Sequence, residues 1–265
     1  MTRTWNPADP DAALLTLART ERLVIALDFD GTVSELVAEP MAARAIPEAA
    51  AALGALTVLP DTIVAFVSGR SLGDLRVISE HADDSQIVLA GSHGAQYWYP
   101  GEGERGPIET VEERERREEI GRIVRSILTE HPDVHFEPKT FGVGIHGRRA
   151  SLAAERAAFA AVDAALAAHT DGWRRREGDR ILEYASRSEG KDAAIATLRA
   201  RYQPTAILFA GDDVTDEDAI RALGPGDLGI RVGEGETAAT LRVDSPQQIA
   251  QVLSVIAHER AARAQ

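Results

Sequence analysis

Four apolar runs rich in β-branched residues constrain the fold of this chain more than any other feature of its 265 residues. Each run is bounded by turn or helix-start residues, which is typical of buried parallel strands. Helical stretches lie between the runs, and this alternation predicts a doubly wound, Rossmann-like α/β core with a parallel sheet. The predicted strands are Leu23–Phe29, Thr62–Ser68, Gln86–Ser92 and Ala206–Asp212, with shorter ones at Leu228–Val232 and Leu241–Val243, and the predicted helices include Pro47–Leu59, Ser71–His81 and Asp192–Tyr202.

The middle of the chain differs in composition from the parts on either side of it. A Gly/Glu-rich stretch and a highly charged helix open this part, and we therefore predict a catalytic core of residues 1–100 and 186–265 with an inserted α/β cap, or lid, of residues 101–185. An inserted cap is expected over the carboxyl ends of the core strands, where open α/β sheets bind ligands. Its predicted antiparallel sheet and helices are built from Glu109–Glu130, Val134–Pro138, Gly142–His146, Ser151–His169 and a hairpin Trp173–Glu177/Arg180–Ala185 that turns at Gly178-Asp179.

Charge and composition exclude several classes of function. The formal net charge is −13 and the basic residues are scattered among acidic ones, which argues against a nucleic-acid or anionic-membrane partner. The chain has no cysteine, so it uses neither disulfides, thiolate metal sites nor a thiol nucleophile. It has no signal-peptide pattern and no apolar run of the roughly 18 residues that span a bilayer. We expect a soluble cytoplasmic protein acting on a small molecule, with a monomer as the working assumption.

Two acidic clusters follow predicted strands. The first is Asp28-Phe29-Asp30-Gly31-Thr32, and the second runs from Gly211 to Asp218 and carries Asp212 and Asp213 ahead of a helix start. Stabilisation of a helix N-terminus explains the later acids of the second cluster but not Asp212 and Asp213. Because Mg²⁺ prefers a few carboxylates together with substrate phosphate oxygens, Asp28 and Asp212 on adjacent strands predict a Mg²⁺ site. A zinc or copper site would need His or Cys, and the glycine and glutamate spacing of a calcium-binding EF-hand is missing.

A phosphoryl group also needs hydrogen-bond donors and positive charge. Ser68-Gly69-Arg70-Ser71 follows the second predicted strand and supplies a hydroxyl with backbone amides at a helix start. Lys191 begins another helix after Gly190 and supplies a point charge. A carboxylate nucleophile forms an acyl phosphate, and a nearby carboxylic acid can protonate the leaving oxygen. We assign attack to Asp28 and proton transfer to Asp30, with Mg²⁺ and Lys191 neutralising the phosphoryl oxygens.

The four motifs, in this order, resemble the haloacid dehalogenase superfamily, and the resemblance spans Leu23 to Val243. Three segments look like its trehalose-6-phosphate phosphatase branch, namely Gly91-Ser92-His93-Gly94-Ala95, Glu137-Pro138-Lys139 and the acidic run from Gly211 to Asp218. The resemblance implies an enzyme with an α/β cap that hydrolyses a disaccharide 6-phosphate, trehalose 6-phosphate, through an aspartyl phosphate.

The resemblance also implies roles for individual residues. Asp28, Asp30 (through its backbone carbonyl) and Asp212 would bind the metal, with Asp213 and Asp216 supporting them, and Asp30 would be the general acid/base. Phosphate would be held by Thr32, Ser68, Gly69 and Lys191, with Ser68 and Lys191 counted among the catalytic residues. Substrate would be contacted by Arg70 and His93 in the core and by Glu137, Lys139 and Glu183 in the cap, with His146 as a neighbour on the adjoining strand.

One departure leaves the sugar open. The family commonly places an Arg-Pro-containing segment after the glutamate at position 183, whereas this chain continues Tyr184-Ala185-Ser186-Arg187. A sucrose-type, glucosylglycerol or pseudo-disaccharide phosphate is therefore an alternative substrate. Phosphate transfer to an acceptor other than water is a second alternative, and a non-catalytic sugar-phosphate sensor is a third.

Overall fold

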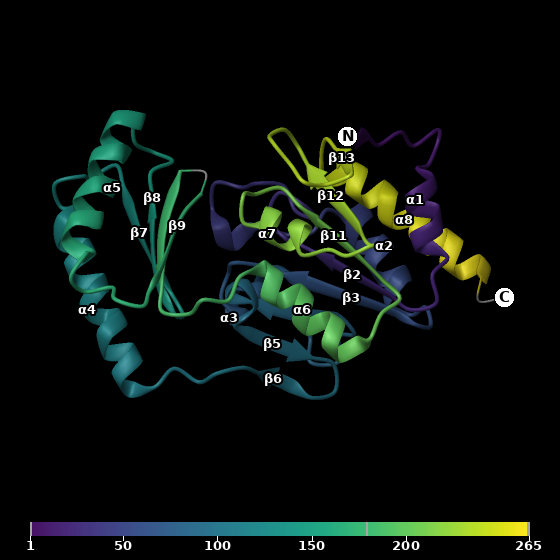
Figure 1. Ribbon diagram of the computed structural model, residues 1–265, viewed down its shortest axis with the longest axis horizontal. Coiled ribbons are helices and arrows are strands. Elements are labelled where there is room, and N and C mark those ends of the chain that lie inside the picture. Colours follow the sequence, from purple (N-terminus) through teal and green to yellow (C-terminus); the bar gives the residue numbers. More distant parts are fainter. Residues whose placement is uncertain (1, 179, 264–265) are drawn as a thin grey trace. The chain divides into compact units, whose positions relative to one another are not determined.

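The computed structural model describes residues 2–178 and 180–263, and the chain divides into two compact units (Figure 1). The core unit consists of residues 1–106 and 189–265, and the inserted unit of residues 107–188. The division predicted from composition lay after residues 100 and 185.

The core unit is built on one sheet with nine strands among the described residues, in the order β1-β13-β12-β11-β2-β3-β4-β5-β6. Neighbours from β1 through β4 are parallel, whereas β5 and β6 extend the far edge in antiparallel fashion. The strands are β1 (Arg3–Thr4), β2 (Leu23–Leu27), β3 (Thr62–Val67), β4 (Val88–Gly91), β5 (Gln96–Tyr99), β6 (Gly103–Arg105), β11 (Ala206–Gly211), β12 (Leu228–Val232) and β13 (Leu241–Val243).

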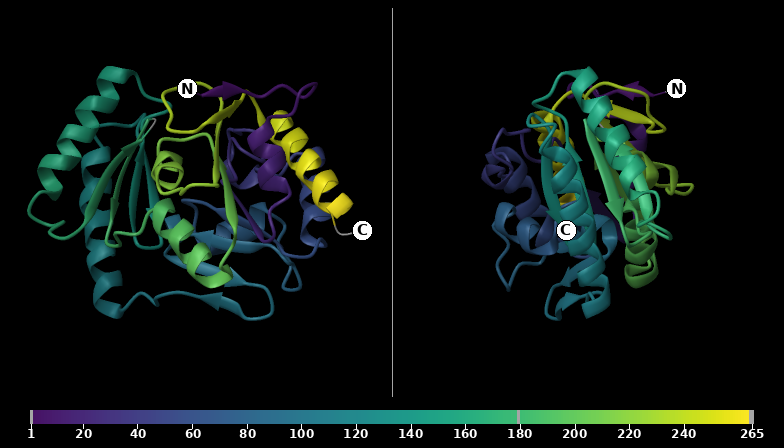
Figure 2. Two further views of the ribbon diagram at one scale, coloured as in Figure 1. Left: turned by 45° about the vertical axis from the view of Figure 1, so that its right-hand side comes forward. Right: turned by 90° about the vertical axis from the view of Figure 1, so that its left-hand side faces the viewer.

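Helices cover both faces of the core sheet, so its central strands are buried throughout and read as continuous apolar runs. One face packs against α1, α2, α3 and α8, and the other against α6 and α7 (Figure 2). The predicted doubly wound α/β fold is confirmed. The helices are α1 (Ala12–Ala18), η1 (Pro40–Ala42), α2 (Pro47–Thr57), α3 (Leu72–Ile78), η2 (Ser92–Gly94), α6 (Lys191–Tyr202), α7 (Asp216–Arg221) and α8 (Pro246–Arg263).

The winding of the chain places the functional residues. From β2 the chain moves outward to β3 and β4, and after the inserted unit it returns to β11 on the other side of β2. The strand order therefore reverses at β2 and β11, where open α/β sheets bind ligands at their carboxyl ends. Asp28 and Asp212 directly follow these two adjacent strands.

The inserted unit is a four-stranded antiparallel sheet in the order β7-β8-β10-β9, with α4 and α5 packed on one face (Figure 2). Alternate residues such as Val143, Ile145 and Leu182 point into the apolar layer under the helices. The predicted hairpin is formed by β9 and β10, while Asp179 of its turn lies outside the described residues. The elements are α4 (Val111–Leu128), β7 (His135–Lys139), β8 (Gly142–His146), α5 (Leu152–Leu166), β9 (Arg174–Gly178) and β10 (Ile181–Ala185).

Within residues 2–178 and 180–263, no helix combines the length and the hydropathy needed to cross a bilayer.

Candidate active site

The centre of the site is a buried group of charges at the carboxyl end of β2. Lys191, the first residue of α6, places its Nζ 2.7 Å from Asp28 Oδ1 and 2.6 Å from Asp216 Oδ1. All three side chains are buried. A buried charge is stable only when it is paired, so Lys191 and the two carboxylates hold each other in place.

The pKa values in this group follow from burial and from an excess of acids. Burial raises the pKa of the Asp28 carboxyl well above its ordinary value, against the lowering effect of Lys191, and the charges of Asp216, Asp212 and Asp30 raise it further. Burial opposes the charge of Lys191, but Asp216 and Asp28 outweigh it and raise the pKa of the ammonium group. One lysine does not neutralise the acids, and a further positive charge would stabilise them.

Three carboxylates form the candidate metal centre. One oxygen each of Asp28, Asp212 and Asp216 lies within 4.8 Å of the other two. Burial and the charge of Asp216 raise the pKa of Asp212 to about 7. A compact set of hard oxygen donors with uncompensated negative charge fits Mg²⁺.

Asp216 joins Asp28 and Asp212 in this cluster, whereas the sequence gave it a supporting role and assigned the backbone carbonyl of Asp30 to the metal. We expected Asp216 to support the site as a helix-start acid, and it does begin α7 while its Oδ2 accepts a hydrogen bond of 2.9 Å from the Asp213 amide. Its other oxygen faces Lys191. Gly31 lets Asp212 approach, because its φ of +74° suits glycine and a Cβ there would collide with the Asp212 carboxylate.

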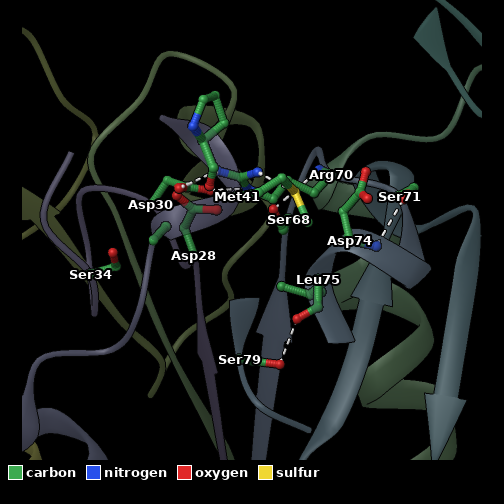
Figure 3. A network of polar contacts seen from close by, with 12 residues as sticks. Asp28, Asp30, Ser34, Met41, Ser68, Arg70, Ser71, Asp74, Leu75 and Ser79 are labelled. Atoms are coloured by element: carbon green, nitrogen blue, oxygen red, sulfur yellow. Dashed lines mark hydrogen bonds and ion pairs between the residues drawn. The ribbon is translucent and has the colours of Figure 1, made fainter. Parts of the chain in front are cut away.

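The Asp30 carboxylate is bound by Arg70, which the sequence assigned to the substrate (Figure 3). Arg70 Nε lies 2.6 Å from Oδ2 and Arg70 Nη2 lies 2.7 Å from Oδ1, so the pair is bidentate. Arg70 follows β3 and Asp30 follows β2, and these strands are neighbours in the sheet. The two acids of the first motif thus have different cationic partners.

The predicted phosphate-binding residues lie on the same two loops. Ser68 is buried after β3, and its Oγ accepts a hydrogen bond of 3.2 Å from the Arg70 amide. The Thr32 hydroxyl is buried and has no hydrogen-bond partner among the residues that the structure describes. A buried hydroxyl without a partner is costly unless a ligand satisfies it. At Gly69 a Cβ would lie 2.6 Å from His93 Cε1, so the His93 ring packs directly over this glycine.

Arg231, which the sequence did not single out, orders the second acidic loop. This nearly buried residue at the end of β12 donates from Nη1 to the carbonyl oxygen of Asp213 at 3.0 Å. Its Nε and Nη2 donate to the Glu234 carbonyl oxygen at 3.2 and 3.0 Å. An arginine in an apolar strand was the available signal, since such a residue is buried only when its donors are satisfied.

The predicted sugar-binding residues of the inserted unit come together on the face of its sheet opposite the helices. Lys139 Nζ lies 2.9 Å from Glu137 Oε2 and 3.3 Å from Glu183 Oε1. His146 Nε2 lies 2.5 Å from the same Glu137 oxygen. These side chains share a face because Glu137 and Glu183 both pair with Gly144 across the strands.

The charges of this network compensate one another. Burial alone would raise the pKa of Glu137, but the hydrogen bond from His146 and the charge of Lys139 lower it to about 2. Burial alone would lower the pKa of Lys139, but Glu183 and Glu137 raise it. The arrangement offers several donors and acceptors on one surface, as recognition of a polyhydroxylated ligand requires.

A sequence model described as trehalose-phosphatase matches residues 26–247. The chain belongs to the trehalose-phosphatase family. The resemblance predicted from the motifs is thereby confirmed.

Curated relatives agree with this assignment. Trehalose-phosphate phosphatases of Mycobacterium marinum and Mycobacterium ulcerans are 32% and 33% identical to this family member over 94% of its length. The chain spans 66% of the length of each of these two proteins. Among solved structures, the C-terminal domain of the C. albicans trehalose-6-phosphate phosphatase superposes with a TM-score of 0.81 at 19% identity, covering 97% of this chain and 98% of that one. This last likeness shows the shared fold.

Proposed function

We propose that the chain is a Mg²⁺-dependent phosphatase that hydrolyses trehalose 6-phosphate to trehalose and phosphate. The observation that carries the proposal is the buried Asp28, which is paired with Lys191 and joined to Asp212 and Asp216 at the carboxyl end of β2. Membership of the trehalose-phosphatase family and the names of the mycobacterial relatives support the substrate.

Asp28 is the nucleophile. A carboxylate oxygen of Asp28 attacks phosphorus, the bond from phosphorus to the sugar oxygen breaks, and the proton of the Asp30 carboxyl passes to that oxygen. Water then attacks the acyl phosphate and gives its proton to Asp30, which releases phosphate and restores both carboxyl groups. Lys191 keeps Asp28 oriented and offsets part of the negative charge.

The phosphoryl group is bound by residues around Asp28. The Ser68 hydroxyl, the Gly69 amide and the Thr32 hydroxyl, which has no partner among the described residues, are assigned to its oxygens. Asp28, Asp212 and Asp216 would hold Mg²⁺, with Asp213 supporting them and the Asp30 carbonyl as a further ligand. When bound, the ion would supply positive charge to the transferring phosphoryl group.

Sugar recognition is assigned to Glu137, Lys139 and Glu183. Their half-buried charged groups satisfy one another in the structure, and sugar hydroxyls can replace these contacts with hydrogen bonds of similar kind. His93 is assigned to the edge of the phosphate site, where its ring covers Gly69.

The test is phosphate release from trehalose 6-phosphate, sucrose 6-phosphate, glucose 6-phosphate and 4-nitrophenyl phosphate, each with Mg²⁺ and with excess chelator. The proposal predicts chelator-sensitive hydrolysis with the highest kcat/KM for trehalose 6-phosphate, and equal amounts of trehalose and phosphate. A higher kcat/KM for another sugar phosphate would show that this compound, and not trehalose 6-phosphate, is the preferred substrate. Sugar in excess of phosphate would indicate transfer to another acceptor, and no release from any compound would favour a sensor.

A further inference from the structure

Arg70 contacts several groups of the core unit in addition to Asp30. Besides its two bonds to Asp30, its Nη2 donates to the Pro40 carbonyl oxygen at 2.9 Å, and its Nη1 lies 3.9 Å from Met41 Sδ (Figure 3). Its backbone amide donates to Ser68 Oγ. The guanidinium group is thus tied to the segment after β2, while its own backbone is tied to the end of β3.

Asp30 depends on this anchor for its orientation. Its side chain is 28% exposed and both of its oxygens bind Arg70, whereas Asp28 is fixed in the buried group by Lys191. A bidentate arginine sets both the position and the plane of a carboxyl group. Each carboxyl oxygen has two lone pairs, so one pair on each oxygen can accept from Arg70 while the other takes part in proton transfer.

We propose that Arg70 is a positioning residue, which holds the Asp30 carboxyl group for proton transfer to the leaving oxygen, and that it acts through Asp30 and not by contact with substrate. The inference rests on the proposed phosphatase function. Proton transfer requires the donor within hydrogen-bond reach of the leaving oxygen, and misplacement by about 1 Å can cost on the order of 100-fold in rate.

This role predicts a loss that depends on the leaving group. The value of kcat/KM reports the steps up to the first phosphoryl transfer, in which a sugar oxygen needs a proton and 4-nitrophenolate does not. Arg70→Met should therefore lower kcat/KM for the sugar phosphate by about 100-fold or more, within the range of general acid catalysis. Its kcat/KM for 4-nitrophenyl phosphate should stay near the wild-type value. Arg70→Lys keeps the positive charge but not the two parallel donors, so its kcat/KM for the sugar phosphate should lie between those of the wild type and Arg70→Met.

A matched control separates this effect from loosening of the loop. Arg44 donates to the carbonyl oxygens of Met41 at 3.0 Å and Ala43 at 2.6 Å, so it tethers the same segment without contacting Asp30. Arg44→Met should leave the ratio of the two kcat/KM values unchanged. Asp30→Asn should show the selective loss of Arg70→Met, and the double variant should lose no more than Asp30→Asn alone.

Equal losses on both substrates, or losses that add in the double variant, would overturn the inference, because either result indicates direct contact with phosphate or substrate. A second readout does not need activity. In thermal unfolding, the Tm losses of Arg70→Met and Asp30→Asn should sum to more than the loss of the double variant, and additive losses would refute the pairing. A wild-type protein that hydrolyses none of the phosphates refutes the proposed function instead, and the unfolding cycle still decides whether Arg70 holds Asp30.

Discussion

The acidic cluster of the core unit and the polar network of the inserted unit are both sets of paired charges, but they differ in burial. Lys191 and Asp216 have almost no exposed surface, whereas the Glu137 side chain is 41% exposed. A buried charge that loses its partner destabilises the fold strongly, and a half-exposed one is rescued by water. A charge in the core cluster that loses every partner should therefore destabilise the fold more than a charge of the polar network in the inserted unit.

Replacement of the nucleophile should give the largest effect. Asp28→Asn removes the attacking carboxylate, and kcat should fall by a factor on the order of 10⁴ to 10⁶, the range seen when a catalytic nucleophile or its partner is removed. The fold should survive because Lys191 keeps Asp216 as its partner. Phosphate release and circular dichroism measure the two effects. Asp84→Asn, which changes an exposed residue of the same unit, is the control. Comparable activity of the two variants would rule out Asp28 as the nucleophile.

Two arginines outside the candidate active site test how burial affects the contribution of a charge to stability. Arg260 is 4% exposed, and it donates to Thr62 Oγ1 at 2.7 Å and to five backbone carbonyl oxygens. Arg260→Met should lower the free energy of unfolding by about 2–4 kcal/mol, because buried acceptors lose their donor. Arg175 pairs with Asp163 and Glu177 and is 39% exposed. Arg175→Met should therefore lower the free energy of unfolding by less than about 1 kcal/mol.

Urea unfolding monitored by circular dichroism measures both arginine variants. The urea midpoint should fall further for Arg260→Met than for Arg175→Met. Equal shifts in the two midpoints would contradict the expected effect of burial.

Changes in the polar network should affect binding of the sugar more than the chemistry. Glu183→Gln and Glu137→Gln should each raise KM for trehalose 6-phosphate by about 10- to 100-fold, the usual consequence of losing a hydrogen bond to a charged group. Hydrolysis of 4-nitrophenyl phosphate should be unaffected. Glu177→Gln is the control, because Glu177 pairs with Leu182 and lies on the opposite face of the same sheet. An equal loss of kcat/KM on both substrates would show that the network does not recognise the sugar.

The pH dependence of stability should show the smallest effect. The pKa of Glu137 is lowered from 4.5 to about 2, so its stabilising contribution is present above pH 4.5 and is lost as the pH falls toward 2. The difference in Tm between the wild type and Glu137→Gln should therefore shrink between pH 7 and pH 3. Solvent screening keeps the difference small. A difference that stays constant or grows in acid would show that Glu137 is not held as a stabilised carboxylate.

The sequence predicted the core strands well because burial on both faces makes them continuously apolar. Leu228–Val232 and Leu241–Val243 have the predicted bounds, and β2 and β11 end two residues and one residue earlier than predicted. The antiparallel strands β5 and β6 at one end of the sheet and the edge strand β1 at the other were not predicted. Gln96–Tyr99 alternates between half-buried and buried residues, and β6 lies in the glycine-rich stretch that was interpreted as a domain boundary.

The site could be predicted as far as the backbone determines it. Asp28, Asp212 and Lys191 follow strands or begin a helix, so topology alone brings them near one another. The direction of a side chain is not in the sequence pattern. For that reason the sequence did not predict that the Asp216 carboxylate lies beside those of Asp28 and Asp212, or that Arg70 binds the Asp30 carboxylate.

Trapping of a phosphorylated form of the protein decides whether Asp28 is the nucleophile. The protein is mixed with Mg²⁺ and trehalose 6-phosphate carrying ³²P, quenched in acid within one turnover, reduced with borohydride and digested, and the modified peptide is sequenced by mass spectrometry. We predict label in the quenched protein, reduction of Asp28 to homoserine, and no label in Asp28→Asn. Turnover of the substrate without a labelled protein, or label on a residue other than Asp28, would contradict the account.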